Sequence, residues 1–158
     1  MQHLISTAQF KTLDEVLLLF HLAEHYREKK EADFLANRVV GLVFHERSPR
    51  TRCSFEAAPY KAGGGVIFEG LETSSAGKGE TLEDTVRTMS QYCELMVVRT
   101  DKGGHVGTSA TKAYCPVING GDGANEHPTQ ALLDMYTIWR KKPELNFSIM
   151  FCGDLADG

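Results

Sequence analysis

The sequence predicts an α/β fold: an open, mostly parallel sheet with helices on both faces. Short apolar strands alternate with amphipathic helical patterns along the chain, as in proteins whose parallel strands are joined by helices. Two of the apolar runs end in polar turns that open into helical patterns, near residues 48 and 127. The chain has 158 residues, of which 42% are hydrophobic and 24% charged, enough for one domain with its own core.

The first predicted elements are a helix over residues 13–29 and a buried strand over 38–44. Thr12 and Glu15 fit a capping box at the start of the helix. The strand is predicted from a run of β-branched and aromatic residues. The apolar side chains expected on one face of the helix are Leu13, Val16, Leu17, Phe20 and Ala23.

A second helix is predicted from residue 49 to about 62. Ser48 suits its N-cap and Pro49 its first turn, and the three glycines at 63–65 end it. The remaining predicted elements are a strand at 66–68, a loop at 71–80, a helix at 81–93, a strand at 95–99, a turn at 102–104, a strand at 116–119, a helix at 129–140 and a last strand at 147–152.

Charge and composition exclude several classes of function. The net charge is −4 and no block of Lys and Arg occurs, so no nucleic-acid partner and no anionic membrane surface are expected. No apolar run is long enough to span a membrane, and the N-terminus lacks a secretion signal. The four cysteines are far apart, which favours reduced, mostly buried thiols in a cytoplasmic protein.

Metal chemistry has little support in the sequence. His21 and His25 have the i, i+4 spacing that suits a metal ion, but no third ligand accompanies them. No paired cysteines with zinc-site spacing occur either. The spacing of histidines and cysteines therefore gives little support to a metal site.

The turn from Ser48 to Arg52 has residues suited to binding a phosphate group. It lies where a strand gives way to a helix N-terminus, whose free N–H groups and dipole favour an anion. Ser48 and Thr51 add hydroxyls, and Arg50 and Arg52 add forked donors. These residues alone fit equally well a capped helix with two solvated arginines, and Pro49 lacks one N–H donor.

Two further groups follow predicted strands. Arg99 ends an apolar strand, at the edge where open α/β sheets bind ligands. His127 precedes a helix that begins with Thr129 and Gln130; a neutral imidazole there suits donation to a carbonyl oxygen, and Gln130 suits an amide. Taken singly, Arg99 fits a strand-end arginine reaching water, and His127 fits an ordinary loop histidine.

Four ordered segments resemble the carbamoyl-phosphate domain of aspartate carbamoyltransferases. They are Ser48-Pro-Arg-Thr-Arg-Cys-Ser-Phe-Glu56, Lys78-Gly-Glu-Thr-Leu-Glu-Asp-Thr85, Val97-Val-Arg99 and the stretch 119–134. Gly153-Asp-Leu155 also resembles the strand end that opens the second half of that fold. The resemblance covers essentially the whole chain, and the Gly-Asp-Gly before His127 favours the aspartate branch over the ornithine branch.

This resemblance implies a set of site residues and a reaction. Ser48, Arg50 and Thr51 are expected to hold the phosphate. Thr51, Arg99 and His127 are expected to surround the carbamoyl oxygen and act in catalysis, with Gln130 on the carbamoyl nitrogen. On a loop of small and polar residues, Ser74 and Lys78 are expected to reach into a neighbouring subunit's site, which implies a homotrimer. The implied partners are carbamoyl phosphate and phosphate, and the implied reaction carbamoylates L-aspartate in pyrimidine biosynthesis. The resemblance implies no metal and no organic cofactor.

Two departures from the family pattern leave alternatives open. The family usually has threonine where Pro49 stands, and residues 1–158 are expected to be the carbamoyl-phosphate domain alone, without the aspartate-binding domain. The chain is then either the phosphate-binding half of an enzyme, inactive by itself, or a non-catalytic anion-binding or assembly subunit. A generic nucleotide-binding domain is a weaker alternative because no Gly-x-Gly-x-x-Gly turn is present.

Overall fold

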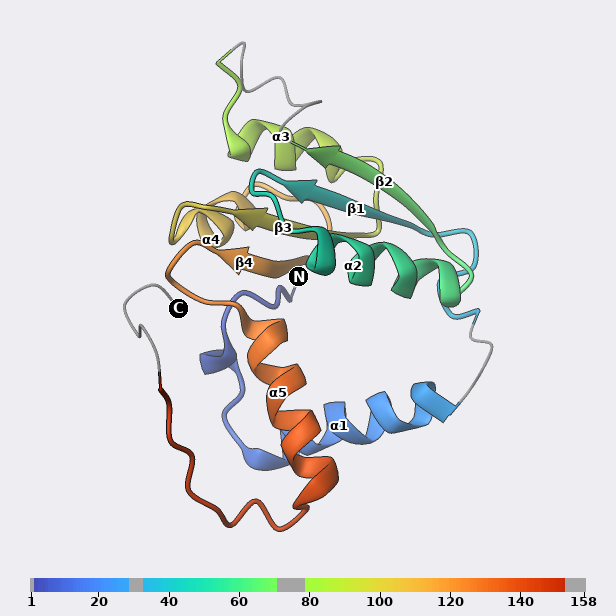
Figure 1. The fold of residues 1–158 in the computed structure, drawn as a ribbon. Coiled ribbons are helices and arrows are strands. Elements are labelled where there is room, and N and C mark those ends of the chain that lie inside the picture. Colours follow the sequence, from blue (N-terminus) through green and yellow to red (C-terminus); the bar gives the residue numbers. More distant parts are fainter. Residues whose placement is uncertain (1, 29–32, 71–78, 153–158) are drawn as a thin grey trace.

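A computed structural model describes residues 2–28, 33–70 and 79–152 of the chain. Its centre is a sheet of four parallel strands in the order β2-β1-β3-β4. Helices lie on both faces of the sheet (Figure 1), so the predicted fold class is confirmed. The strands are β1 (Val39–Phe44), β2 (Gly65–Gly70), β3 (Leu95–Thr100) and β4 (Val117–Asp122).

The two central strands carry the core because both of their faces are covered. Val43 and Val98 belong to a buried cluster that they form with side chains of α3 (Leu82–Met89) and α4 (His105–Ala110). Leu42 and Val97 point to the opposite face and pack with Phe55 of α2 (Pro49–Lys61). Because both faces of these strands are buried, their apolar runs are continuous and do not alternate between apolar and polar residues.

Helix α1 (Leu13–Glu28) packs against α5 (Pro128–Lys141) and not against the sheet (Figure 1). The Phe20 ring is buried, with its centroid 5.7 Å from that of Tyr136 and 5.6 Å from that of Trp139. The capping box at Thr12 is confirmed, since Glu15 N–H donates to its hydroxyl and Thr12 N–H donates to the Glu15 carboxylate. The predicted apolar face is only partly buried, because Leu13 and Ala23 are exposed.

Glycines end α2 as predicted. Gly63 has a φ of +80°, a conformation that costs glycine little. Its N–H donates to Tyr60 O at 3.2 Å, and Gly64 N–H donates to Pro59 O at 2.9 Å. These two bonds form a Schellman motif, which satisfies carbonyls that the helix end would leave unpaired.

The structure differs from the sequence prediction in two elements. Helix α4, over residues 105–110, was not predicted. The strand predicted at 147–152 is wrong: these residues form no strand, and Met150 and Phe151 are largely exposed. An apolar run becomes a strand only beside a partner that accepts its backbone hydrogen bonds, and no described strand lies next to this one. Residues 153–155, which carried part of the resemblance, lie outside the described residues.

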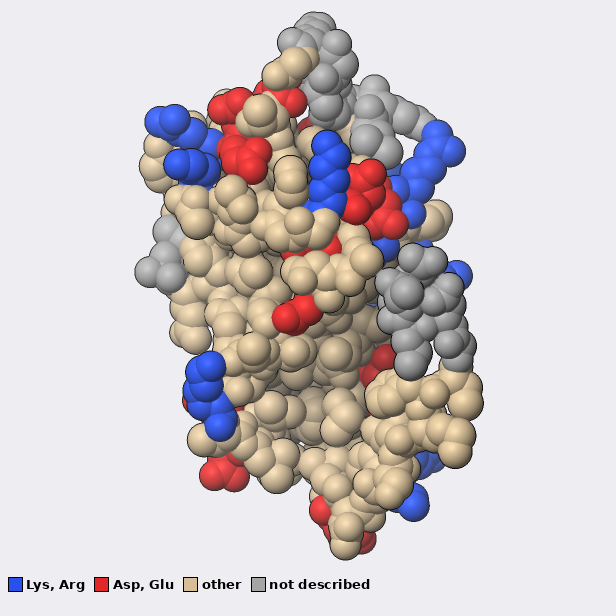
Figure 2. All heavy atoms as spheres, turned by 90° about the vertical axis from the view of Figure 1, so that its left-hand side faces the viewer, with Lys and Arg blue, Asp and Glu red and all other residues tan. Residues whose placement is uncertain are grey.

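No helix within the described ranges has the length and apolar character needed to cross a membrane. Figure 2 views the molecule from the side toward which the strands point. On that face, acidic and basic side chains are interspersed, and uncharged residues occupy most of the middle. A mixed surface of this kind gives no broad field of one sign, in line with the net charge of −4.

Candidate active site at the carboxyl edge of the sheet

The candidate site lies where β1, β3 and β4 end. The strands are parallel, so their carboxyl ends meet at one edge, where open α/β sheets bind ligands. Phe44 of β1 pairs in register with Arg99 of β3, which brings the turn before α2 beside Arg99. At the end of β4 the chain turns through residues 122–127 and begins α5 at Pro128.

The first turn of α2 has the free amides expected of an anion site. Pro49 occupies the first helical position, so the amides of Arg50 and Thr51 are the ones without an intrahelical partner. Ser48 stands at the N-cap but makes no side-chain cap; its hydroxyl donates to the Thr51 hydroxyl at 2.9 Å. Ser48 therefore occupies the predicted N-cap position, but its Oγ bonds to Thr51 and leaves those amides uncapped.

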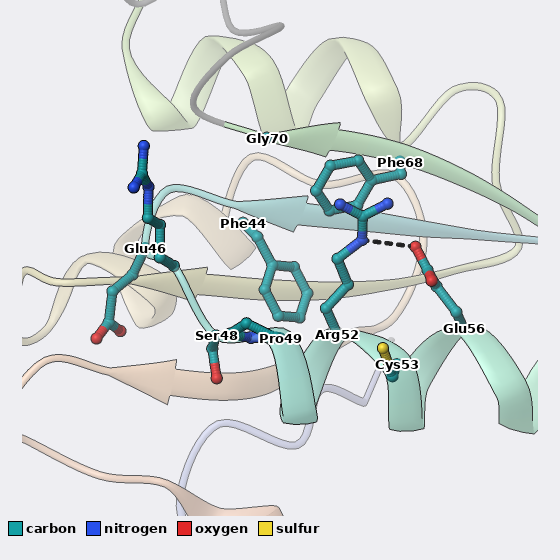
Figure 3. A pocket seen from close by; sticks show the side chains of 10 residues that line it. Phe44, Glu46, Ser48, Pro49, Arg52, Cys53, Glu56, Phe68 and Gly70 are labelled. Atoms are coloured by element: carbon teal, nitrogen blue, oxygen red, sulfur yellow. Dashed lines mark hydrogen bonds and ion pairs between the residues drawn. The ribbon is translucent and has the colours of Figure 1, made fainter.

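The two arginines of this turn have different surroundings. Arg50 is exposed on the first turn of α2. Arg52 points to β2 instead: its guanidinium lies 3.6 Å from the centroid of the Phe68 ring, and its Nε lies 2.7 Å from Glu56 Oε1 (Figure 3). Arg52 already has two partners, which argues against the expectation that it offers donors to a phosphate. The same expectation for Arg50 stays a prediction.

Arg99 is held between two strand ends. Its Nε donates to Glu46 Oε2 at 2.9 Å, and its Nη1 donates to Gly120 O at 3.0 Å. The Arg99 side chain is 15% exposed and that of Glu46 is 35% exposed, so the pair is partly shielded from solvent. Because these bonds use Nε and Nη1, Nη2 is the nitrogen that they leave for a ligand. Glu46 was not predicted, although it lies two residues after the buried strand β1, at the same edge of the sheet as Arg99.

His127 stands at the N-cap of α5 and is half-buried. Burial lowers its pKa below the ordinary value of 6.5, and the positive charge of Arg99 lowers it further; Glu46 and Asp134 act in the opposite direction. The imidazole is therefore neutral at pH 7, with one N–H to donate. The Thr129 hydroxyl lies 3.4 Å from its Nδ1.

The remaining predicted residues are placed less centrally or not described. Gln130 lies in the first turn of α5, is exposed and donates from Nε2 to Asp134 Oδ1 at 3.0 Å. Ser74 and Lys78 lie outside the described residues. The structure thus brings Arg99 close to Glu46 and to the β4 turn that leads to His127, and it places Ser48, Arg50 and Thr51 at the adjoining helix end.

A pocket of about 650 Å³ adjoins this site on the β2 side of α2 (Figure 3). It shares Glu46 and Ser48 with the candidate site, but Phe44, Phe68 and Arg52 form much of its wall. The pocket contains neither Arg99 nor His127. A small polar anion is matched better by the uncapped amides of α2 than by these aromatic walls.

The histidines that suggested a metal have aromatic partners instead. The His21 ring lies 5.2 Å from Trp139 and the His25 ring 5.1 Å from Tyr26, both edge-on. Across the described ranges, no three His, Cys, Asp or Glu side chains are grouped so as to hold a metal ion.

Fold and site together define an open α/β domain whose ligand groups gather at the carboxyl edge of a parallel sheet. Residues 2–140 match the family model for the aspartate/ornithine carbamoyltransferase carbamoyl-P binding domain. The chain therefore belongs to this family.

Named relatives agree with the family assignment. The aspartate carbamoyltransferase catalytic subunit of Methanococcus maripaludis strain C6 is 42% identical over 164 aligned positions, which cover 100% of this chain and 54% of the relative. Ligand-free aspartate transcarbamoylase from Trypanosoma cruzi superposes with a TM-score of 0.88 at 34% identity, over 99% of this chain and 51% of that one.

A second Trypanosoma cruzi structure was solved in complex with carbamoyl phosphate and aspartate. It superposes with a TM-score of 0.83 at 38% identity and covers 88% of this chain and 47% of that one. The chain thus spans about half the length of the relatives it matches.

Proposed function

We propose that this chain is the carbamoyl-phosphate-binding half of an aspartate carbamoyltransferase. The observation that carries the proposal is the pairing of an uncapped helix N-terminus, at Ser48 to Thr51, with the Arg99 guanidinium held at the next strand end. The helix N-terminus suits a phosphate, and the Arg99 guanidinium suits a carbonyl oxygen. Similarity to aspartate carbamoyltransferase catalytic subunits over the whole chain supports this assignment.

In the proposed complex, the phosphate of carbamoyl phosphate lies at the start of α2. Ser48 and Thr51 supply hydroxyls, Arg50 supplies charge, and the free amides of the first turn donate to the phosphate oxygens. Pro49 removes one donor, so this site has fewer hydrogen bonds to offer than a site with threonine there. The carbamoyl group then extends toward Arg99 and His127, with Gln130 near its nitrogen.

The proposed reaction is attack by the amine nitrogen of aspartate on the carbamoyl carbon. A C–N bond forms, negative charge develops on the carbamoyl oxygen, and the bond between the carbamoyl carbon and the phosphate oxygen then breaks. The departing phosphate takes the proton that the amine loses. Thr51, Arg99 and neutral His127 stabilise the oxyanion; losing one such donor typically costs about 10²–10³ in rate.

The remaining parts of the proposal concern the complete protein. We infer that aspartate is held by residues outside 1–158, in a second domain. We also infer that Ser74 and Lys78 complete the site of a neighbouring subunit in a homotrimer, and that the protein works in the cytoplasm in pyrimidine biosynthesis. Holding the amine in line is a large part of such catalysis, so residues 1–158 alone should bind one substrate without turnover.

Subunit mixing in the complete protein tests the shared site. Chains carrying Lys78→Ala are combined with chains carrying His127→Ala, and carbamoyl-aspartate formation is measured in verified hybrids. Hybrids should regain part of the activity that each parent lacks, because one interface then has both native groups. A wild-type protein with no carbamoyl-aspartate formation would refute the enzyme proposal and favour the anion-binding subunit. Active wild type with no recovery in the hybrids would refute the shared site alone.

A further inference from the structure

The N-terminal segment, residues 3–9, lies along the outer edge of β4. Leu4 forms a parallel bridge with Ile118. Leu4 N–H donates to Val117 O at 2.9 Å, and Asn119 N–H donates to Leu4 O at 2.8 Å. The segment ends in the short 3₁₀ turn η1 (Thr7–Gln9). It therefore extends the sheet beside the strand that leads into the candidate site.

Asn119 links this segment to Arg99. Its side chain is fully buried; Nδ2 donates to Ile5 O at 2.9 Å, and Oδ1 accepts from Gly121 N–H at 2.8 Å. The bond to Gly121 fixes the backbone next to Gly120, whose carbonyl accepts from Arg99 Nη1. Gly121 N–H and Gly120 O belong to the same peptide group. The side-chain amide of Asn119 therefore bonds both to the N-terminal segment and to the peptide group that accepts from Arg99.

Glu126 links the same segment to His127. Its Oε1 accepts from the Ser6 hydroxyl at 2.6 Å, and its Oε2 accepts from Thr7 N–H at 3.0 Å. Its backbone carbonyl accepts from Asp122 N–H at 3.0 Å, which closes the turn after β4. Hydrogen bonds to a carboxylate are short and strong, and His127 is the next residue in the chain.

We propose that the N-terminal segment, through Glu126 and Asn119, fixes the positions of His127 and Arg99 for the carbamoyl group, and that Glu126 is a positioning residue. This rests on the proposed function. His127 lies in a loop, and loops are the mobile parts of a domain. A functional side chain keeps its geometry only when its supporting groups are themselves held by hydrogen bonds. Glu126 supplies that support from a segment some 120 residues away in sequence.

The proposal is tested with three variants of the 158-residue chain and one control. Glu126→Ala removes both bonds to the segment, and Ser6→Ala removes one of them. Glu126→Gln retains both, because its amide oxygen accepts from Thr7 N–H and its NH₂ donates to Ser6 Oγ. Glu15→Ala is the control: it removes another carboxylate that accepts from nearby backbone, at Lys11 and Thr12, away from the site.

The first readout compares two ligands by calorimetry, carbamoyl phosphate and inorganic phosphate. Glu126→Ala should weaken the binding of carbamoyl phosphate about tenfold, the effect of losing one charged hydrogen bond. It should change the affinity for inorganic phosphate less than about twofold, because phosphate needs only the α2 turn. Glu126→Gln and Glu15→Ala should leave both affinities close to wild type. An equal loss of affinity for both ligands, or no loss of affinity for carbamoyl phosphate, would overturn the positioning role.

The second readout does not depend on the proposed function. It is the titration of the His127 ring followed by NMR, with Arg99, Glu46 and Asp134 as the charged groups around it. The Glu126 charge favours the protonated ring, so its loss alone would lower the His127 pKa. Burial keeps that pKa low, so release of the ring from its packing would raise it. We expect a rise in Glu126→Ala and Ser6→Ala and none in Glu126→Gln. An unchanged or lower pKa in Glu126→Ala would overturn the proposal.

The two readouts separate failure of this inference from failure of the proposed function. If wild type binds phosphate but shows no preference for carbamoyl phosphate, the proposed function fails, and the His127 titration alone decides whether the segment fixes the ring.

Discussion

Arg99 Nε lies 2.9 Å from Glu46 Oε2, so the ends of β1 and β3 are joined by an ion pair at the edge where the candidate site forms. The second bond of Arg99, to Gly120 O, joins the same guanidinium to β4. One side chain therefore holds three strand ends in a fixed relation. A guanidinium fixed in this way needs little reorganisation when charge develops on a ligand oxygen.

The first prediction concerns Gly121, which lies against Arg99. Its φ is +124°, and a methyl group there would come within 2.5 Å of Arg99 Nη1. Gly121→Ala should push the Arg99 guanidinium away. The binding of carbamoyl phosphate should then weaken about tenfold, because one charged hydrogen bond is lost. Calorimetry measures this, with Gly107→Ala as the control, because its methyl group meets only Ile5 Cγ2 at 3.5 Å. Equal affinity in Gly121→Ala and wild type would contradict this placement of Arg99.

The second prediction is a pH effect from His127. Burial and Arg99 lower its pKa from 6.5, so the unfolded chain takes up the proton more readily than the folded one. Its contribution to stability is complete above pH 6.5 and is lost as the pH falls toward the folded-state pKa. Thermal unfolding of wild type and His127→Gln between about pH 7.5 and 5.5 checks this. The wild type should lose more stability on acidification; an equal loss would show that His127 is not buried as described.

The third prediction concerns thiol reactivity. Cys53 and Cys152 are exposed, whereas Cys93 and Cys115 are buried. Burial raises the pKa of Cys93 to about 12 and that of Cys115 to about 11, and only the thiolate reacts. A chromogenic disulfide reagent should therefore modify two thiols in the folded chain and all four in denaturant. Fast reaction of Cys93 or Cys115 in the folded chain, located by peptide mapping, would contradict the packing between β3 and α3.

The fourth prediction concerns the core. Leu42 is fully buried on β1, so Leu42→Ala should lower the free energy of unfolding by about 2–5 kcal/mol, through lost burial and the cavity left behind. Leu18→Ala is the matched control: that side chain is 61% exposed, and surface substitutions usually change stability by about 0.5 kcal/mol or less. Urea unfolding of the two variants gives the comparison, and equal losses would refute the assignment of β1 to the centre of the sheet.

Much of the fold could be predicted from the sequence because the central strands are buried on both faces. Runs such as 39–44 and 95–98 must then be apolar throughout, and glycines 63–65 mark where α2 stops. Helix α4 could not be found in this way. Its N-terminus is held by the Asp122 carboxylate, which accepts from Gly104 N–H at 2.9 Å and Val106 N–H at 3.2 Å, and a contact across 16 residues leaves no local pattern.

The candidate site was predictable in its residue types but not in its contacts. Parallel strands place their carboxyl ends together, so a polar turn at Ser48 and an arginine at residue 99 are expected at one edge. The pairing of Arg99 with Glu46 depends on the register of β1 and β3. The diversion of Arg52 to the Phe68 ring depends on β2 lying beside α2. Neither can be obtained from spacing along the chain.

The central claim is that a phosphate binds at the first turn of α2 through Arg50. Calorimetric titration of the 158-residue chain with freshly prepared carbamoyl phosphate tests it most directly, in wild type, Arg50→Ala and Arg52→Ala. Arg50→Ala should weaken binding at least about tenfold, since a charged hydrogen bond contributes about 1.5–3 kcal/mol. Arg52→Ala should have a much smaller effect, because Arg52 is paired with Glu56 and lies over Phe68. Unchanged binding in Arg50→Ala, or a larger loss in Arg52→Ala, would contradict the account.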